Sequence, residues 1–242
     1  MEEVLHSHAE PILRLSPACK LCRKYIRGPL SFFSRLRGIF PDPLNPPYCN
    51  RCGNPKEWPH GEQTLTILFG DIREYTKLSE QMKPQELHAM LNKYFSVTSK
   101  VLIQEGAVIN KFIGDAMMAF FNSPHPQEGH EKMALRAAVR MQEVVNGLRI
   151  PYLKMGIGVH SGIALVGNIG GEQSRDFTAI GDTVNTASRL QSQAQGGQIV
   201  VSNEVYVKAN GVIPSSFRVE QKSLQLKGKE QPVEAYIIST TS

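Results

Sequence analysis

Two aspartates, Asp71 and Asp115, each stand where a run of apolar residues ends. Asp71 closes TLTILFGDI (64–72), a β-branched and apolar run that predicts a buried strand. Asp115 follows Gly114 in AVINKFIGDAMMAFF (107–121), which predicts two short strands joined by a tight hairpin. A carboxylate on a rigid strand end suits an oxygen-coordinated divalent cation such as Mg²⁺. Taken singly, each residue is better explained as a turn aspartate or a helix cap.

The four cysteines form a second set of candidate ligands, as the pairs Cys19-x₂-Cys22 and Cys49-x₂-Cys52. Two such pairs in a cytosolic chain predict a Zn²⁺ site, because four thiolates complete a closed tetrahedral site. A redox-active pair or free thiols are the alternatives. A structural ion also explains how a short, proline-rich segment with little core can fold.

A change in composition near residue 60 divides the chain into a module over 1–60 and a domain over 61–242. Nine of the fifteen prolines and nine Lys and Arg against five acidic residues precede this boundary. The net charge of +5 therefore belongs mainly to the N-terminal module. We expect a solvated basic face rather than a surface for nucleic acid or an anionic membrane, because no run of five basic residues occurs.

The segment SFFSRLRGIF (31–40) combines five apolar side chains with two arginines. Packing onto the zinc module or onto a dimer is the expectation, and contact with a partner or a membrane surface is the alternative. The N-terminal twenty residues have no apolar h-region, and no run approaches the eighteen or so residues that cross a bilayer. A cytoplasmic protein is the expectation.

The order of elements after residue 60 predicts an α+β fold, with an antiparallel or mixed sheet packed by helices on one face. Helices are predicted by Pro84 at a first turn and by apolar residues at helical spacing. Beyond the strand at 64–72 and the hairpin at 107–121, the expected elements are helices from Pro84 toward Gly106, over 134–148 and over 182–193, a second hairpin over 154–170 turning near Ser161-Gly162, and strands over 199–202 and 233–238.

The surrounding motifs, taken together, favour a functional role for the two aspartates over a turn or a helix cap. In order, these motifs are FGDIREYT (69–76), NKFIGDAMMAFF (110–121), GIGVHSGIALVGNIG (156–170) and DFTAIGDTVNTASRL (176–190). Together they resemble the class III adenylyl/guanylyl cyclase catalytic domain from about Thr64 to Ile238. The cysteine pairs resemble a cysteine-rich segment that precedes some bacterial cyclase domains. The resemblance implies a ferredoxin-like βαββαβ core with extra strands, working as a homodimer with active sites at the interface.

The resemblance also assigns roles around the first strand. The positions of Asp71 and Asp115 bind two Mg²⁺ or Mn²⁺ ions in each active site, assisted by the carbonyl of Ile72. Backbone N–H groups of Tyr75 and Thr76, which open the following helix, are expected to bind phosphate oxygens.

Base selection is assigned by the resemblance to Lys111 and Thr178. A lysine and a threonine at these positions recognise adenine, whereas guanine-binding members carry Glu and a small polar residue. Discrimination of this kind arises because the wrong base leaves buried polar groups unpaired. The pair therefore favours ATP as the substrate.

Asn185 and Arg189 lie four residues apart, so both project from one face of the predicted helix. By resemblance they position the ribose and bind α-phosphate oxygens as charge develops, a task for which a guanidinium is suited. Lys227 matches a lysine that binds the terminal phosphates, with Lys229 as the alternative on the same strand face.

One position departs from the family. Many members have an arginine that reaches the triphosphate where this chain has Gly156, and Lys154 is a candidate substitute. We expect an active adenylyl cyclase that forms cyclic AMP and pyrophosphate. A cyclase acting on another nucleoside triphosphate, or a nucleotide-sensing protein without catalysis, is the alternative.

Overall fold

The computed structural model describes residues 26–41, 50, 60–170, 175–209 and 211–240. The chain divides into two compact units, Met1–Trp58 and Pro59–Ser242. Because the four cysteines lie outside the described residues, the predicted zinc site does too. Within the described ranges, no three His, Cys, Asp or Glu side chains are grouped to hold a metal ion, and no helix is long and apolar enough to cross a membrane.

The described part of the first unit is a short helical segment, with a 3-10 turn over Pro29–Ser31 and helix α1 over Phe32–Arg35. Ile26 and Ile39 are buried, while the aromatic and leucine side chains between them are mostly exposed.

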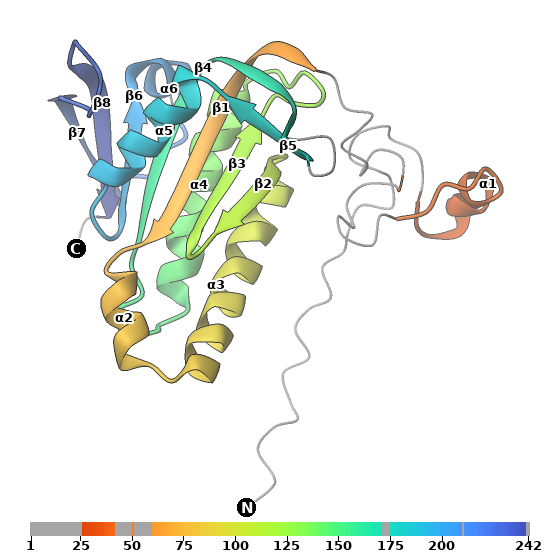
Figure 1. Ribbon diagram of the computed structural model, residues 1–242, viewed down its shortest axis with the longest axis horizontal. Coiled ribbons are helices and arrows are strands. Elements are labelled where there is room, and N and C mark those ends of the chain that lie inside the picture. The colour runs from red at the N-terminus through yellow and green to blue at the C-terminus, as the bar shows by residue number, and fades with distance from the viewer. Residues whose placement is uncertain (1–25, 42–49, 51–59, 171–174, 210, 241–242) are drawn as a thin grey trace, which may run out of the picture. The chain divides into compact units, whose positions relative to one another are not determined.

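The second unit is built on one eight-stranded mixed sheet with the order β2-β3-β1-β4-β6-β8-β7, and β5 pairs with β4 (Figure 1). Strand β4 pairs with β6 in parallel and with β1 and β5 in antiparallel fashion, so the predicted mixed sheet is confirmed. The strands are β1 (Gly61–Ile72), β2 (Val108–Ile113), β3 (Ala116–Phe121), β4 (Met155–Gly170), β5 (Arg175–Ile180), β6 (Gln198–Ser202), β7 (Phe217–Leu224) and β8 (Val233–Thr240).

Helices cover both faces of this sheet, so the expectation of helices on one face was wrong. Helices α3, α4 and α6 pack on one face in the main core. Helix α5 packs on the other face, where Leu190 and the following Ala194 are clustered with Val200 of β6. The helices of this unit are α2 (Tyr75–Gln81), α3 (Pro84–Gln104), α4 (His130–Gly147), α5 (Asp182–Gln193) and α6 (Asn203–Lys208).

A glycine on β4 makes the second helical layer possible. A Cβ added at Gly158 would lie 2.2 Å from the backbone nitrogen of Gln191 and 2.5 Å from the carbonyl oxygen of Ala187. Helix α5 therefore rests directly on the strand backbone, and its C-terminal end is brought close to the end of β1.

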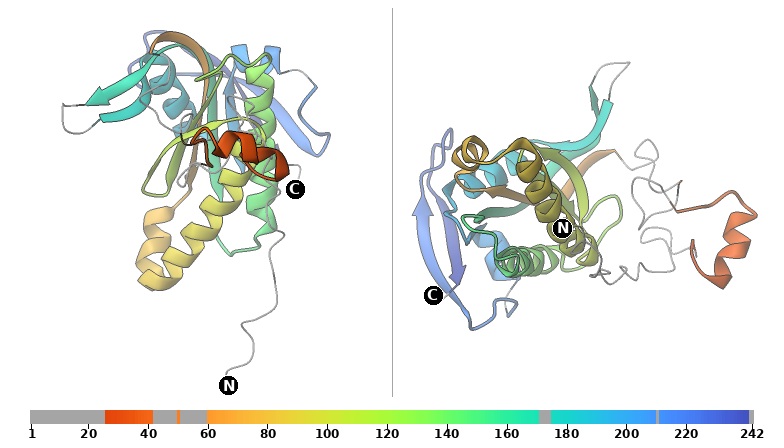
Figure 2. Two further views of the ribbon diagram at one scale, coloured as in Figure 1. Left: turned by 90° about the vertical axis from the view of Figure 1, so that its right-hand side faces the viewer. Right: turned by 90° about the horizontal axis from the view of Figure 1, so that it is seen from below.

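The predicted hairpin at Ser161-Gly162 was also wrong, because β4 runs unbroken from Met155 to Gly170. Ser161 and Gly162 pair with Thr66 and Leu65 of β1, whose twelve residues all have partners on β4. Gly162 instead makes room for α5, since a Cβ there would lie 2.7 Å from the Thr183 hydroxyl oxygen. The hairpin in this region is formed by β4 and β5, which project from the rest of the unit in both views of Figure 2.

Candidate active site

The β2–β3 turn brings Asp115 to the end of β1. Gly114 takes a left-handed conformation there (φ 63°), which suits a glycine in a tight turn. The backbone N–H of Ile72 donates a hydrogen bond to Asp115 Oδ2 at 3.2 Å. Two aspartates forty-four residues apart in sequence are therefore brought to one place, with the Ile72 peptide between them.

The two carboxylates at this position repel each other. Burial and then the neighbouring Asp71 carboxylate raise the pKa of Asp115 to about 7. Asp71 Oδ2 accepts a hydrogen bond from Gln191 Nε2 at 3.3 Å and lies 4.0 Å from a guanidinium nitrogen of Arg73. A single guanidinium at that distance leaves negative charge uncompensated, so the pair fits a divalent cation.

Arg73 is a site residue that the sequence analysis missed. One terminal nitrogen donates a hydrogen bond to the carbonyl of Gln191 at 2.6 Å, at the C-terminal end of α5. A Cβ added at Gly156 would lie 2.3 Å from Arg73 Nε. The volume above Gly156, where the family's arginine begins, is therefore already filled by the Arg73 guanidinium.

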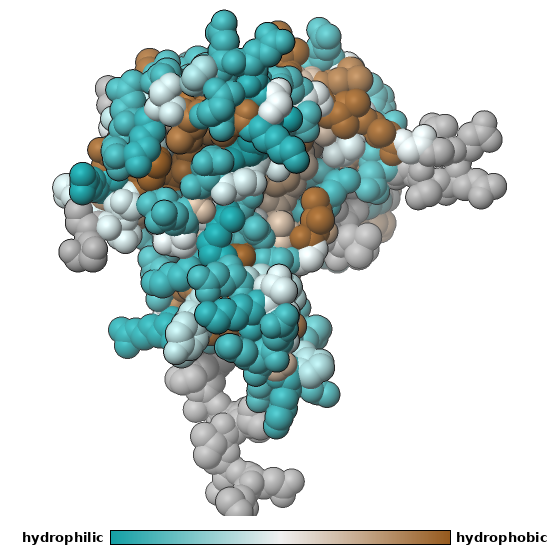
Figure 3. Space-filling view, turned by 60° about the vertical axis from the view of Figure 1, so that its left-hand side comes forward, coloured by the Kyte–Doolittle hydropathy of each residue, from teal (hydrophilic) through white to brown (hydrophobic). Residues whose placement is uncertain are grey.

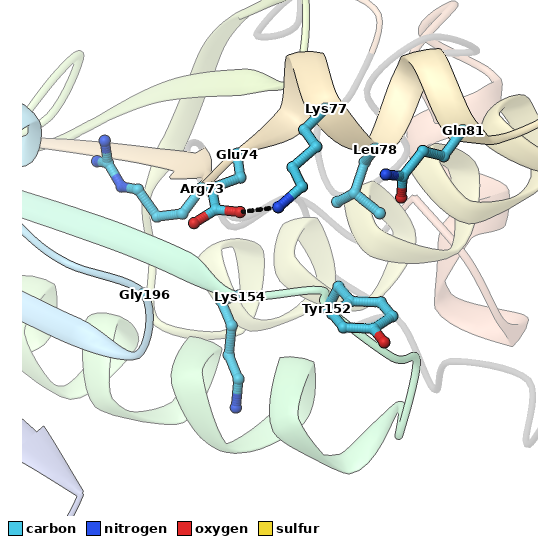
Figure 4. A pocket seen from close by; sticks show the side chains of 8 residues that line it. All are labelled: Arg73, Glu74, Lys77, Leu78, Gln81, Tyr152, Lys154 and Gly196. Carbon is cyan, nitrogen blue, oxygen red and sulfur yellow. Dashed lines mark ion pairs between the residues drawn. The ribbon is translucent and has the colours of Figure 1, made fainter.

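A cavity of about 550 Å³ opens beside Arg73 (Figure 4). Lys154, the candidate substitute for the family's arginine, lines this cavity, and its carbonyl accepts a hydrogen bond from the Arg73 N–H at 2.8 Å. Lys77 also lines it and is paired with Glu74 at 3.7 Å. The cavity is thus lined by three basic side chains and one acidic one, and Arg73 connects it to Asp71.

Tyr75 and Thr76 open helix α2 directly after β1. The first bond of this helix is donated by Leu78 to the carbonyl of Glu74 at 3.1 Å. The N–H groups of Tyr75 and Thr76 precede that bond and have no acceptor within the helix.

Lys111 and Thr178, the predicted base-selecting residues, lie on β2 and β5 and are linked through side chains that the sequence analysis did not single out. Lys111 Nζ forms an ion pair with Asp176 Oδ2 at 3.1 Å. Thr178 Oγ1 donates a hydrogen bond to Asn110 Oδ1 at 2.9 Å. Asn110 directly precedes Lys111, and Asp176 is two residues before Thr178 on the same face of β5, which is the signal that could have identified both.

The other predicted residues gather on and beside α5. Asn185 is exposed and Arg189 is half-buried. Lys229 pairs with Asp182 at the start of the helix and lowers the pKa of that carboxyl, while Lys227 is exposed. Lys227 is therefore the more available of the two lysines.

Helix α5 reaches the aspartates within one chain through Gln191, which donates a hydrogen bond to Asp71 at 3.3 Å. Among the residues that the structure describes, no hydrogen bond or ion pair joins Asn185 or Arg189 to Asp71 or Asp115. The predicted roles divide these residues into a metal-binding half, Asp71 and Asp115, and a base- and ribose-binding half, Lys111, Thr178, Asn185 and Arg189.

Comparison with known proteins agrees with this fold. The family model of the adenylate and guanylate cyclase catalytic domain matches residues 59–240. An adenylate cyclase of Anabaena cylindrica is 35% identical over 185 residues, which cover 71% of this chain and 36% of the relative. The chain therefore spans only about a third of that relative's length.

Two solved structures are similar over the same region. The adenylyl cyclase CyaB from P. aeruginosa has a TM-score of 0.68 at 31% identity, covering 76% of this chain and 97% of that chain. A guanylyl cyclase has a TM-score of 0.67 at 30% identity, covering 76% and 96%. Because enzymes named for different bases match equally well, the fold does not decide the base.

Proposed function

The chain belongs to the adenylate and guanylate cyclase catalytic domain family, and from this we propose that it converts ATP to 3′,5′-cyclic AMP and pyrophosphate. The observation that carries the proposal is the approach of Asp71 and Asp115 at the end of β1, where burial and mutual repulsion raise the pKa of Asp115 to about 7. Carboxylates held this close, with only the Arg73 guanidinium at 4.0 Å to offset their charge, are typical of a site built for metal ions.

Asp71, Asp115 and the carbonyl of Ile72 would hold two Mg²⁺ or Mn²⁺ ions. When bound, such ions lower the pKa of the ribose 3′-hydroxyl and neutralise charge on the departing pyrophosphate. The chain's own contribution is a rigid support, because Asp71 is paired with Gly156 on β4 and Asp115 lies in the two-residue turn between β2 and β3.

ATP is proposed as the substrate because Lys111 and Thr178 match the hydrogen-bonding pattern of adenine. Lys111 can only donate, and adenine N1 accepts. Thr178 can accept from the exocyclic amine. The Anabaena relative is named an adenylate cyclase. GTP and the pyrimidine nucleotides are the competing substrates.

Asn185 and Arg189 would orient the ribose and bind α-phosphate oxygens as negative charge develops there. Lys227 and the N–H groups of Tyr75 and Thr76 would bind the remaining phosphates. Position 156 does not argue against turnover, since Arg73 already places a guanidinium above Gly156 and beside Asp71.

A homodimer is proposed because the family resemblance implies active sites between two chains and because apolar side chains are exposed at two places on this unit. Apolar side chains are exposed on the projecting β4–β5 strands, at Ile163 (65%), Leu165 (46%) and Ile180 (43%). Phe112 and Ile113 are similarly exposed beside the aspartate turn. Apolar side chains also reach the surface among hydrophilic ones on the face drawn in Figure 3. A second copy of the chain that covers the β4–β5 residues would also bring its own Asp71 and Asp115 to the base-selecting half.

For the N-terminal segment we keep the proposal that Cys19, Cys22, Cys49 and Cys52 hold one Zn²⁺ as a structural ion. Elemental analysis of the purified chain should find about one zinc per chain, lost together with folding on chelation. Metal-free protein with a disulfide in either pair would contradict it in favour of redox chemistry.

The substrate is tested by incubating purified protein with ATP, GTP, CTP and UTP separately in Mn²⁺ and identifying products by mass spectrometry. Cyclic AMP should dominate. A different dominant cyclic nucleotide would replace ATP as the substrate, and nucleotide binding with no product would support the sensor alternative.

A further inference from the structure

The donor or acceptor state of the Thr178 hydroxyl decides which base it can pair with. A threonine hydroxyl both donates and accepts, so by itself it can meet either the amine of adenine or the carbonyl of guanine. An aspartate at such a position would accept only. A chain that selects adenine with threonine therefore needs something that fixes the direction of the hydroxyl proton.

Asn110 supplies that direction. Its amide nitrogen donates to the carbonyl of Phe177 at 2.6 Å, and a carbonyl can only accept. This contact fixes which end of the Asn110 amide faces β5, so Oδ1 is the atom that meets Thr178 at 2.9 Å. The other acceptor within reach of Thr178 Oγ1 is the Ala179 carbonyl at 3.5 Å, a much longer contact. The Thr178 proton is then committed to Asn110, and only lone pairs of Thr178 Oγ1 remain for a ligand.

The backbone of β2 is irregular where this contact is made. The β2–β3 register shifts between Ile109 and Lys111, so Asn110 is the extra residue of a β-bulge. In a regular strand, neighbouring side chains point to opposite faces. The bulge lets both Asn110 and Lys111 reach β5, where Lys111 meets Asp176 at 3.1 Å. Bulges commonly re-aim side chains beside functional sites.

We infer that Asn110 is a specificity-determining positioning residue, which makes Thr178 an obligate acceptor and so selects a purine with an amine rather than a carbonyl at position 6. The inference rests on the proposed function, because it concerns the base of the nucleotide that this site binds. Asn110 acts through Thr178 and is not placed against the reacting atoms.

The test compares ATP with inosine triphosphate, which differs in carrying a carbonyl at position 6 and a proton on N1. The ratio of the two kcat/KM values is measured on one preparation of the full chain in Mn²⁺, so the fraction of active enzyme cancels. Asn110→Ala frees the Thr178 hydroxyl to donate, and the ratio should fall by about tenfold. Preference for ATP should not vanish, because Lys111 still opposes the N1 proton.

A second background separates this role from simple packing. In a Thr178→Val background, which lacks the hydroxyl, Asn110→Ala should leave the ratio unchanged. A purely structural Asn110 would lower both kcat/KM values together, and an unchanged ratio in the single variant would overturn the inference. So would an equal change of the ratio in the Thr178→Val background.

Failure of the proposed function is detected separately by binding. The 3′-deoxy forms of both nucleotides lack the attacking hydroxyl, and their Kd values can be measured by calorimetry whether or not turnover occurs. An Asn110-dependent preference for the amine without any cyclic product would retain the inference and reject the cyclase. Equal affinity for the two analogues, or no binding of either, would reject the inference.

Discussion

The guanidinium of Arg73 lies on the Cα of Gly156, where an added Cβ would come within 2.3 Å of Nε and 2.8 Å of the central carbon. The Arg73 guanidinium occupies the space that a side chain at position 156 would need. An arginine at position 156 is therefore incompatible with the hydrogen bond between Arg73 and the Gln191 carbonyl. Arg73 connects the end of β1 to the end of α5 and stands beside Asp71.

Gly156→Ala and Gly158→Ala form a matched pair on β4 that tests this packing. At 156 the added methyl displaces a flexible side chain and breaks one hydrogen bond, so unfolding should cost about 1–2 kcal/mol less than in the wild type. At 158 it meets the backbone of α5 at 2.2 Å, and the loss should reach about 3 kcal/mol or more. Thermal unfolding of both variants measures the difference. A larger loss for Gly156→Ala would contradict the assigned contacts.

Asp115→Asn should lower the activity without lowering the stability of the metal-free protein. The neutral amide removes repulsion from Asp71, so the metal-free variant should be as stable as the wild type or more stable, while turnover falls by about a hundredfold or more. Added Mn²⁺ should raise the Tm of the wild type and not that of the variant, since only an ion bound to the folded state stabilises it. Equal metal-induced shifts in both proteins would remove Asp115 from the metal site.

Mixing two inactive variants tests whether the site is shared between chains. Asp71→Asn removes the metal-binding half and Arg189→Ala removes the α5 half. A heterodimer of the two regains one intact site, so random assortment should restore about a quarter of wild-type activity. Arg189→Ala with Asn185→Ala, both on the α5 half, serves as the control and should restore none. No recovery in the first mixture after subunit exchange would favour a site within one chain.

The stability of the second unit should fall as the pH drops below about 6.5, because one buried and one half-buried histidine resist protonation in the folded chain. Burial lowers the pKa values of His130 and His160 below the ordinary 6.5, so the unfolded chain binds more protons in that window. Stability from these groups is present above pH 6.5 and is lost as the pH falls through their folded pKa values. His130→Gln should flatten the dependence of Tm on pH.

Asp115 has the opposite effect on the pH dependence of stability. Its folded pKa is raised from 3.8 to about 7, so its contribution to the stability of the metal-free protein falls as the pH rises. The histidine measurement is therefore made in the Asp115→Asn background. The exposed His88, changed to Gln, is the control and should leave the slope unchanged. An equal slope for His130→Gln and His88→Gln would contradict the role of burial.

Local patterns in the sequence were sufficient for elements whose ends carry strong signals. Pro84 marked the start of α3, and Gly114 marked the β2–β3 turn, because proline and glycine restrict or permit backbone conformations on their own. Ser161-Gly162 gave the same local signal without a turn, since the glycine serves the approach of α5. A glycine required by a distant helix cannot be distinguished from a turn glycine in one sequence.

In the site, too, local motifs indicated some residues, whereas others depend on contacts between distant segments. The motifs grouped Asp71 with Asp115, and the structure brings the two together. Arg73 gave no signal of its own, and Asn110 had only its place directly before Lys111. Their roles depend on a β-bulge and on a missing side chain at position 156, both of which arise from strand pairing between distant segments. Such contacts are set by register, and register is not a property of any local window.

The most direct measurement of the central claim follows ATP in Mn²⁺ with the full chain and quantifies 3′,5′-cyclic AMP and pyrophosphate together. The wild type should release the two in equal amounts, and Asp71→Asn and Asp115→Asn should each release neither above background. Phosphate release without cyclic AMP, or cyclic AMP formed at the wild-type rate by either variant, would contradict catalysis by this pair of aspartates.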